Sequence, residues 1–419
     1  MIREMARYSI VTGQTMLEGM YQLKGPQGWA VWFIFVPQLL AACVGIAGLA
    51  GVVGSALQSI LPGGASLYAF LLILFSTVFV VSGQYSIIER FSRVMALILM
   101  ATVIVAAAVV APGIGDISQG LIPSWPKQPD LYIILPWVGT ILAGSMGIVW
   151  FGYWTATRGF GGGLESKDSD DECEESGQAE ASNTAALDTS QRIERAKQWI
   201  RVMTGTATLG VIGGLVVITA FLVLGSELLA PEGTVPKGTD VAVDLTRLFS
   251  DVWGSVGEYL LLAAIVIALG GSVLANQDGW GRSFADITLI LTRNQRAQGK
   301  RSRILAGMTQ LGDKVGIRLF KRRHLKRIYV ATITGVIPIA IVLIFEDPVK
   351  VMSASGIIAA LHTPFIALTA LYVNRTQLPS AVKPSLLTTA SMACAGLFYL
   401  GFAGLYVWDL VANAGQSGA

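Results

Sequence analysis

The sequence predicts an all-α, polytopic membrane protein, and three observations support this class. The mean hydropathy is +0.61, 53% of the residues are hydrophobic and only 14% are charged. A soluble chain of this composition would expose apolar surface that only lipid can cover. Nine apolar stretches are each long enough to cross a bilayer, and almost all lysines and arginines lie in alternate loops between them.

Each predicted span has the length of about 20 residues that a helix needs to cross the hydrocarbon layer. Strands are excluded because the apolar runs are too long and do not alternate with polar residues. The shortest span is followed directly by Asn276-Gln277-Asp278, which either cap that helix or line an exit path. The predicted spans are residues 29–57, 65–83, 91–111, 131–156, 202–224, 259–275, 328–345, 352–373 and 386–407.

The positive charges predict the orientation of the chain, because cytoplasmic loops of membrane proteins carry an excess of Lys and Arg. Most of these residues lie before the first span or in every second loop after it. We therefore expect a multi-pass protein of the plasma membrane with a cytoplasmic N-terminus and an extracellular C-terminus. Residues 1–28 lack the uninterrupted apolar core of a signal peptide.

The same pattern divides the chain into five parts. They are a cytosolic segment at 1–28, four spans within 29–157, a cytosolic acidic linker and surface helix at 158–201, five spans within 202–410 that include the basic cytosolic loop 279–327, and a tail at 411–419. The linker carries eight carboxylates between residues 165 and 180, which is typical of a disordered tether. The basic loop has no interleaved aromatic residues or binding motif, so we expect a lipid neighbour and no nucleic-acid partner.

Catalytic motifs are missing from the sequence, which argues against an enzyme or an ATP-driven pump. There is no Walker A motif, no His-Glu-x-x-His and no Gly-x-Ser-x-Gly elbow. The two histidines, His324 and His362, are far apart in the chain, and the three cysteines form no Cys-x-x-Cys pair. We therefore expect no disulfide framework, no thiolate metal site and no resident cofactor.

The span at 131–156 contains the best candidate for a functional site. Its centre, Gly139-Thr140-Ile141-Leu142-Ala143-Gly144-Ser145-Met146-Gly147, has three glycines that weaken a helix by about 1 kcal/mol each relative to alanine. A break there would free backbone groups that a cation or a polar substrate can satisfy. Close packing of helices through small residues is the alternative explanation.

Several motifs, taken in order, resemble those of the Nramp family of divalent metal transporters. Residues 50–56 are similar to the family's Ala-Glu-Val-Ile-Gly-Ser-Ala on its third helix, and residues 9–14 to Val-Thr-Gly-Arg at the end of its second. Gly120-Leu121-Ile122-Pro123 matches the approach to the sixth helix. His362-Thr363-Pro364-Phe365 and Asn374-Arg375 resemble motifs around the tenth.

The resemblance implies two inverted repeats of five helices, the leucine-transporter type of bundle, with the ion at broken helices one and six. The nine spans would then be helices three to eleven, so the first helix and most of the second are absent and the bundle is N-terminally incomplete. Either the true start lies upstream of Met1, or the chain is a degenerate fragment. The expected metal contacts are the Ala143 carbonyl with Gly144, Ser145, Met146 and Thr140, completed by the first helix.

Departures from the family pattern suggest a diverged, magnesium-transporter-like branch. Ala143-Gly144-Ser145 stands where the family has Met-Pro-His, so a soft thioether and a histidine linked to proton movement are both replaced. Loss of the thioether favours hard cations. Gly48 and Gly51 replace the family's Asp and Glu, which argues against proton coupling.

We therefore expect a secondary transporter of divalent cations of the Mg²⁺ or Mn²⁺ class, without proton coupling. The alternatives are an amino-acid or small-solute carrier of the same fold, or a truncated remnant that transports nothing. The expected partners are the cation, as substrate, and the lipid bilayer. The sequence does not predict the direction of transport or the oligomeric state.

Overall fold

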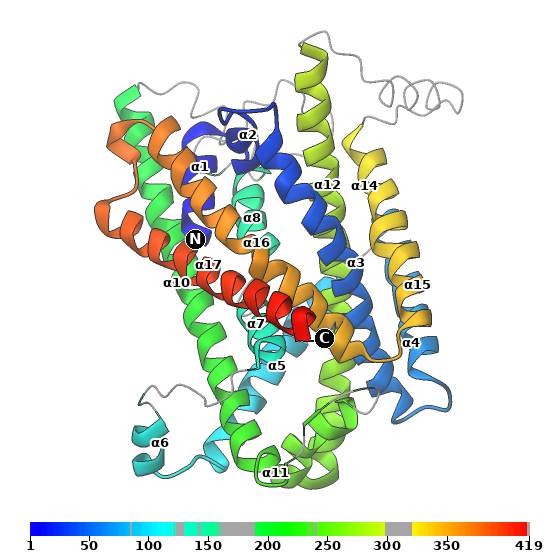
Figure 1. Cartoon of the computed structure of the whole chain (residues 1–419). Coiled ribbons are helices and arrows are strands. Elements are labelled where there is room, and N and C mark those ends of the chain that lie inside the picture. The colour runs from blue at the N-terminus through cyan, green and yellow to red at the C-terminus, as the bar shows by residue number, and fades with distance from the viewer. Residues whose placement is uncertain are drawn as a thin grey trace, which may run out of the picture.

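The computed structural model describes the chain except for residues 84–85, 121, 123–129, 141–143, 158–159, 161–188, 234, 237, 239–240, 298–320 and 417–419. The described part is a bundle of helices and contains no strand (Figure 1). Its α-helices are α1 (Ile2–Thr12), α2 (Met16–Tyr21), α3 (Trp29–Gln58), α4 (Ala65–Ser82), α5 (Ser86–Val109), α6 (Ile114–Gly120), α7 (Leu131–Thr140), α8 (Gly144–Thr157), α10 (Thr189–Leu224), α11 (Val241–Ala264), α12 (Gly270–Ala297), α14 (Arg322–Ala331), α15 (Ile337–Ile344), α16 (Pro348–Gln377) and α17 (Leu386–Gln416). Three short π-helices continue these elements: η1 (Gly225–Leu229) extends α10, η3 (Ile265–Leu269) joins α11 to α12, and η4 (Thr332–Val336) joins α14 to α15. A 3₁₀ turn, η5 (Ser380–Val382), precedes α17.

Eight of the nine predicted spans are confirmed as helices, or helix pairs, that are long and apolar enough to cross a membrane. The ninth expected span falls in α5, whose described apolar stretch, Ala96–Val109, is shorter than the others. The chain is therefore a polytopic helical membrane protein.

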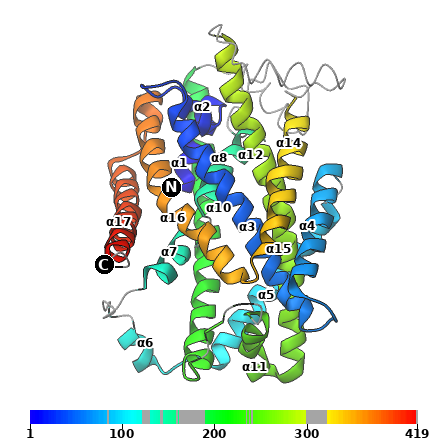
Figure 2. The same ribbon diagram turned by 45° about the vertical axis from the view of Figure 1, so that its right-hand side comes forward.

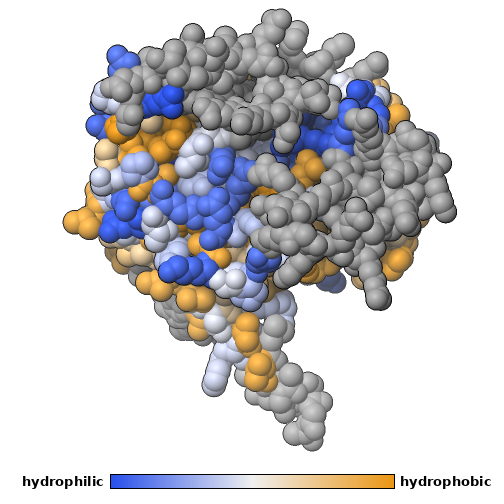
Figure 3. All heavy atoms as spheres, turned by 90° about the horizontal axis from the view of Figure 1, so that it is seen from above, coloured by the Kyte–Doolittle hydropathy of each residue, from blue (hydrophilic) through white to orange (hydrophobic). Residues whose placement is uncertain are grey.

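The two ends of the bundle differ in the loops that they carry. The start of α10, the end of α12, the start of α14 and the connection from α16 to α17 lie at one end (Figure 1). The connections from α3 to α4 and from α15 to α16 lie at the other end, with α6 and α11. Seen from above, hydrophilic residues gather on the first end and hydrophobic residues lie towards its edge (Figure 3).

Helices α3 and α16 pack against each other along most of their length, in opposite directions (Figure 2). A Cβ added at Gly48 would lie 2.7 Å from the Cα of Met352, and one added at Gly51 would lie 2.6 Å from the Cβ of Pro348. These two glycines therefore let the α16 backbone approach α3. Helix α16 also packs against α7 and α17, so it links the middle of the bundle to its edge.

The N-terminal segment 1–28 was predicted to be cytosolic, but its first two helices pack into the bundle. Helix α1 lies against α8 and α10, and residues 4–10 are buried. The Glu4 carboxylate accepts hydrogen bonds from Arg7 at 2.8 Å and from Asn374 at 3.3 Å, which ties α1 to α16. The burial of α1 follows from tertiary contacts that a hydropathy profile does not contain.

The surface helix predicted within 158–201 is not a separate element. Its described part forms the first turns of α10, a single helix that runs from Thr189 into the span without a break. The acidic part of the linker, 165–180, lies outside the described residues.

The span predicted at 259–275 is much longer in the structure, and the basic loop after it is correspondingly shorter. Helix α11 is kinked at Gly254, where φ is 63° and ψ is −149°, and the helix that continues through η3 and α12 ends at Ala297. Asn276-Gln277-Asp278 therefore lie well inside a helix, so their interpretation as a cap is wrong. Of the predicted loop 279–327, residues 279–297 and 322–327 are helical, and residues 298–320 lie outside the described part.

Ion pairs between α12 and α14 explain how charged residues enter these helices. Asp278 contacts Arg282 at 2.8 Å and Lys326 at 2.5 Å, and its side chain is 4% exposed. About two helical turns further along α12, Asp286 pairs with Arg322 at 2.6 Å. Because acid and base meet across the two helices, neither helix has to end where its apolar run ends.

Asp347 starts α16 by accepting hydrogen bonds from the backbone N–H groups of Val349 and Lys350, both at 3.1 Å. Burial alone would raise the pKa of its carboxyl group. The backbone N–H and ammonium group of Lys350, together with the N–H of Val349, outweigh that effect, so the pKa lies below its ordinary value.

Candidate functional site

The span predicted at 131–156 departs from helical geometry at Gly144. Helix α7 ends at Thr140 and α8 begins at Gly144, whose φ of 59° falls in the left-handed region and interrupts the helix. Glycine is the residue that adopts this conformation without a steric penalty. A Cβ at Gly139 would collide with the carbonyl oxygen of Gly356, so α7 and α16 approach each other closely beside the break.

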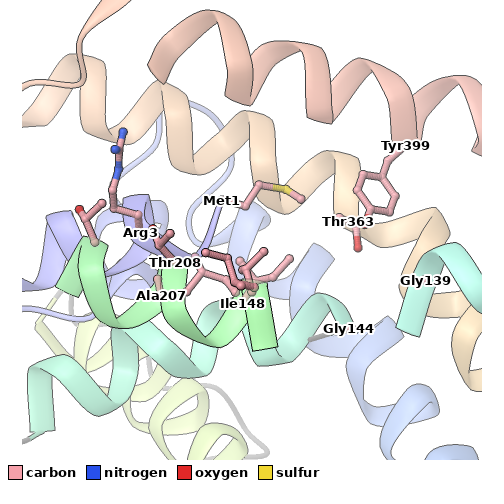
Figure 4. A pocket seen from close by; sticks show the side chains of 13 residues that line it. Met1, Arg3, Gly139, Gly144, Ile148, Ala207, Thr208, Thr363 and Tyr399 are labelled. Atoms are coloured by element: carbon pink, nitrogen blue, oxygen red, sulfur yellow. The ribbon is translucent and has the colours of Figure 1, made fainter. Parts of the chain in front are cut away.

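A cavity of about 420 Å³ opens next to this break (Figure 4). Its wall includes residues from α1, α7, α8, α10, α16 and α17, and most of the lining is apolar. The polar and glycine residues among those that line it are Arg3, Gly139, Gly144, Thr204, Thr208, Thr363 and Tyr399. The interrupted helix therefore meets an open space within the bundle.

A buried polar cluster lies directly after the break and joins three helices. The Nε2 of Gln38, on α3, lies 2.6 Å from the Oγ of Ser145 on α8 and 2.8 Å from the Nδ1 of His362 on α16. All three residues are buried in the bundle. Two of their polar atoms, Gln38 Oε1 and His362 Nε2, have no hydrogen-bond partner among the described residues.

The predicted site residues differ in what they contact. Gly144 lines the cavity and Ser145 belongs to the polar cluster. The Thr140 hydroxyl donates to the Pro136 carbonyl at 2.7 Å, within its own helix. Met146 packs into the apolar core, and Ala143 lies outside the described residues.

The sequence reasoning missed Gln38 and did not connect it with His362. The available signal was an amide side chain directly after Pro37 in the middle of an apolar span. Polar side chains at such a depth are costly and mark functional sites. The sequence did not show that Gln38 contacts His362, which is 324 residues away in the chain.

The donor atoms at this site are those of a hydroxyl, an amide and an imidazole, with the backbone of the broken helix. Within the described ranges, no group of three or more His, Cys, Asp or Glu residues is placed to hold a metal ion. Of these donors, the hydroxyl and amide oxygens are of the kind that suits hard ions, whereas the imidazole of His362 is of the kind that suits transition metals.

A family model described as "Natural resistance-associated macrophage protein-like" (Nramp) matches residues 2–277, well over half of the chain. The chain belongs to the Nramp family. No curated protein matches it. The predicted family is thus confirmed, and with it the leucine-transporter type of helical bundle. Membership of the Nramp family implies the transport of divalent metal ions across a membrane.

The match covers the broken helix and Gln38, whereas His362 lies beyond its last residue. Gly48 and Gly51, which the sequence analysis expected at the positions of two family carboxylates, are the glycines of α3 that contact α16. A side chain at Gly48 or Gly51 would have to displace Met352 or Pro348. The space beside these two glycines is therefore filled by α16.

Proposed function

We propose that this Nramp protein carries a hard divalent cation, Mg²⁺ or Mn²⁺, across the plasma membrane without moving protons in exchange. The observation that carries the choice of ion is the polar cluster beside Gly144, where the Ser145 hydroxyl and the amide oxygen of Gln38 are neutral oxygen ligands. Ala143 is the residue expected where the family has a thioether. Hydroxyl, amide and backbone oxygens are ligands of hard cations. The cation would contact the Ala143 carbonyl, Gly144 and the Ser145 hydroxyl as it passes the break. Contacts with Thr140 and Met146 stay predictions.

The packing of α3 on α16 supports the absence of proton coupling. A proton relay through a membrane needs ionisable side chains along its path. At Gly48 and Gly51 the space for such side chains is taken by Met352 and Pro348. The bundle end at which α10 and α14 begin carries many Lys and Arg, which supports a cytoplasmic location for this end and for the N-terminus.

The proposal is tested by reconstituting the full-length native protein into liposomes. We expect uptake of Mg²⁺ or Mn²⁺, followed with an indicator dye inside the vesicles, and reduced uptake by Ser145→Ala. Failure to move either ion would overturn the proposed substrate. A pH dye in the same vesicles tests coupling separately, and acidification of the lumen driven by the metal gradient would show that protons are moved.

A further inference from the structure

Gln38 is placed to control the hydrogen bonding of Ser145 and His362. It is 0% exposed, and its amide nitrogen lies between Ser145 and His362, on two different helices. An amide NH₂ group has two hydrogens and donates with both. The Oγ of Ser145 and the Nδ1 of His362 therefore both accept.

The hydrogen bond to Nδ1 decides which nitrogen of His362 carries the proton. A neutral imidazole that accepts at one nitrogen carries its hydrogen on the other. His362 is accordingly protonated at Nε2, and its Nδ1 lone pair is occupied by the Gln38 amide.

We propose that Gln38 is a specificity-determining residue that keeps His362 from binding the transported cation. This inference rests on the proposed function. With Nδ1 hydrogen-bonded and Nε2 protonated, the ring has no lone pair to offer to a metal ion. The cation then meets oxygen atoms, among them the unpartnered Gln38 Oε1, while the nitrogen ligand that transition metals favour is withheld.

The first test removes the amide with Gln38→Leu. The Nδ1 of His362 is then free to bind metal, so binding of Mn²⁺ and Cd²⁺ by the purified protein should rise about tenfold relative to Mg²⁺. Adding His362→Leu should abolish this gain. Adding His324→Gln, which changes the other histidine of the chain, should leave the gain intact. A gain that survives the loss of His362, or the absence of any gain, would overturn the proposal.

The second test observes the tautomer directly, without transport. Because the chain has two histidines, ¹⁵N-histidine labelling with the His324→Gln variant as reference assigns His362. In the metal-free protein we expect a protonated Nε2 and an unprotonated Nδ1. In Gln38→Glu, whose carboxylate can only accept, Nδ1 should become protonated. A protonated Nδ1 in the native protein, or an unprotonated Nδ1 in the variant, would refute the assignment.

The two tests separate the inference from the function on which it rests. If no form of the protein binds Mg²⁺, Mn²⁺ or Cd²⁺, the proposed transport function fails, and the tautomer measurement still reports whether Gln38 controls His362. If Mg²⁺ binds but Gln38→Leu does not change the preference between ions, the function stands and the role of Gln38 is refuted.

Discussion

The ion pair between Asp278 and Lys326 gives the sharpest prediction about stability. Replacing Asp278 with Asn removes the charge that faces both Arg282 and Lys326, whose side chains are only 23% and 15% exposed. Breaking a buried pair costs about 3–5 kcal/mol, because the remaining charge is left without a partner. Since both cations keep some contact with solvent, we expect about 3 kcal/mol, the lower end of this range.

The assay is thermal unfolding of the protein in detergent micelles or lipid nanodiscs at a fixed scan rate. At about 2 °C per kcal/mol for a large chain, Asp278→Asn should lower the midpoint by about 6 °C. The exposed pair Glu194–Lys197, with side chains 63% and 46% exposed, provides the matched control. Glu194→Gln removes a charge of the same sign from α10 and should cost less than about 1 kcal/mol.

A double variant tests whether the loss of stability comes from cations that lack the Asp278 carboxylate. Replacing Lys326 with Met in the Asp278→Asn protein removes one of the two cations that have lost the Asp278 carboxylate. The double variant should therefore unfold at a higher temperature than Asp278→Asn alone. If it unfolds at a lower temperature, or if Asp278→Asn is tolerated as well as Glu194→Gln, the charges are not held as a buried pair.

Three further substitutions test the packing, the break and a helix cap. Gly48→Asp should reduce the yield of folded protein on size-exclusion chromatography, because its Cβ would lie 2.7 Å from Met352. Gly205→Ala, at a position with nothing within 4 Å, should be neutral. Gly144→Ala should cost about 1–2 kcal/mol in thermal unfolding, because φ is 59° at this position. Asp347→Ala should cost about 0.5–2 kcal/mol through the lost cap. The pKa of Asp347 is lower in the folded state than its ordinary value of 3.8. Its contribution to the free energy of unfolding is therefore fully present above pH 3.8 and is lost as the pH falls through the folded-state pKa. The native protein and the variant should thus converge in stability at low pH.

Local composition predicted the parts of this protein that depend on neighbouring residues in the chain. Apolar runs of bilayer length predicted eight spans that the structure confirms as helices, because transfer into lipid depends mainly on the residues of the span itself. The glycines at 139–147 predicted where a helix would be interrupted, and Gly144 has the left-handed conformation that interrupts it. The order of short motifs identified the Nramp family before any fold was known.

Only the tertiary structure decided which distant residues meet. Helix α12 extends far beyond its apolar run because Asp278 finds Lys326 on another helix, and a hydropathy profile treats both charges as the end of a span. Gln38 and His362 are 324 residues apart in the sequence, and they meet only because α3 packs along α16. Hydrophobicity acts residue by residue, whereas hydrogen bonds and ion pairs require two partners at a set distance. The sequence by itself therefore determined the class and the family and left the glycines at 139–147 with two explanations, a break or close packing. The packing of the helices decided which atoms surround Gly144.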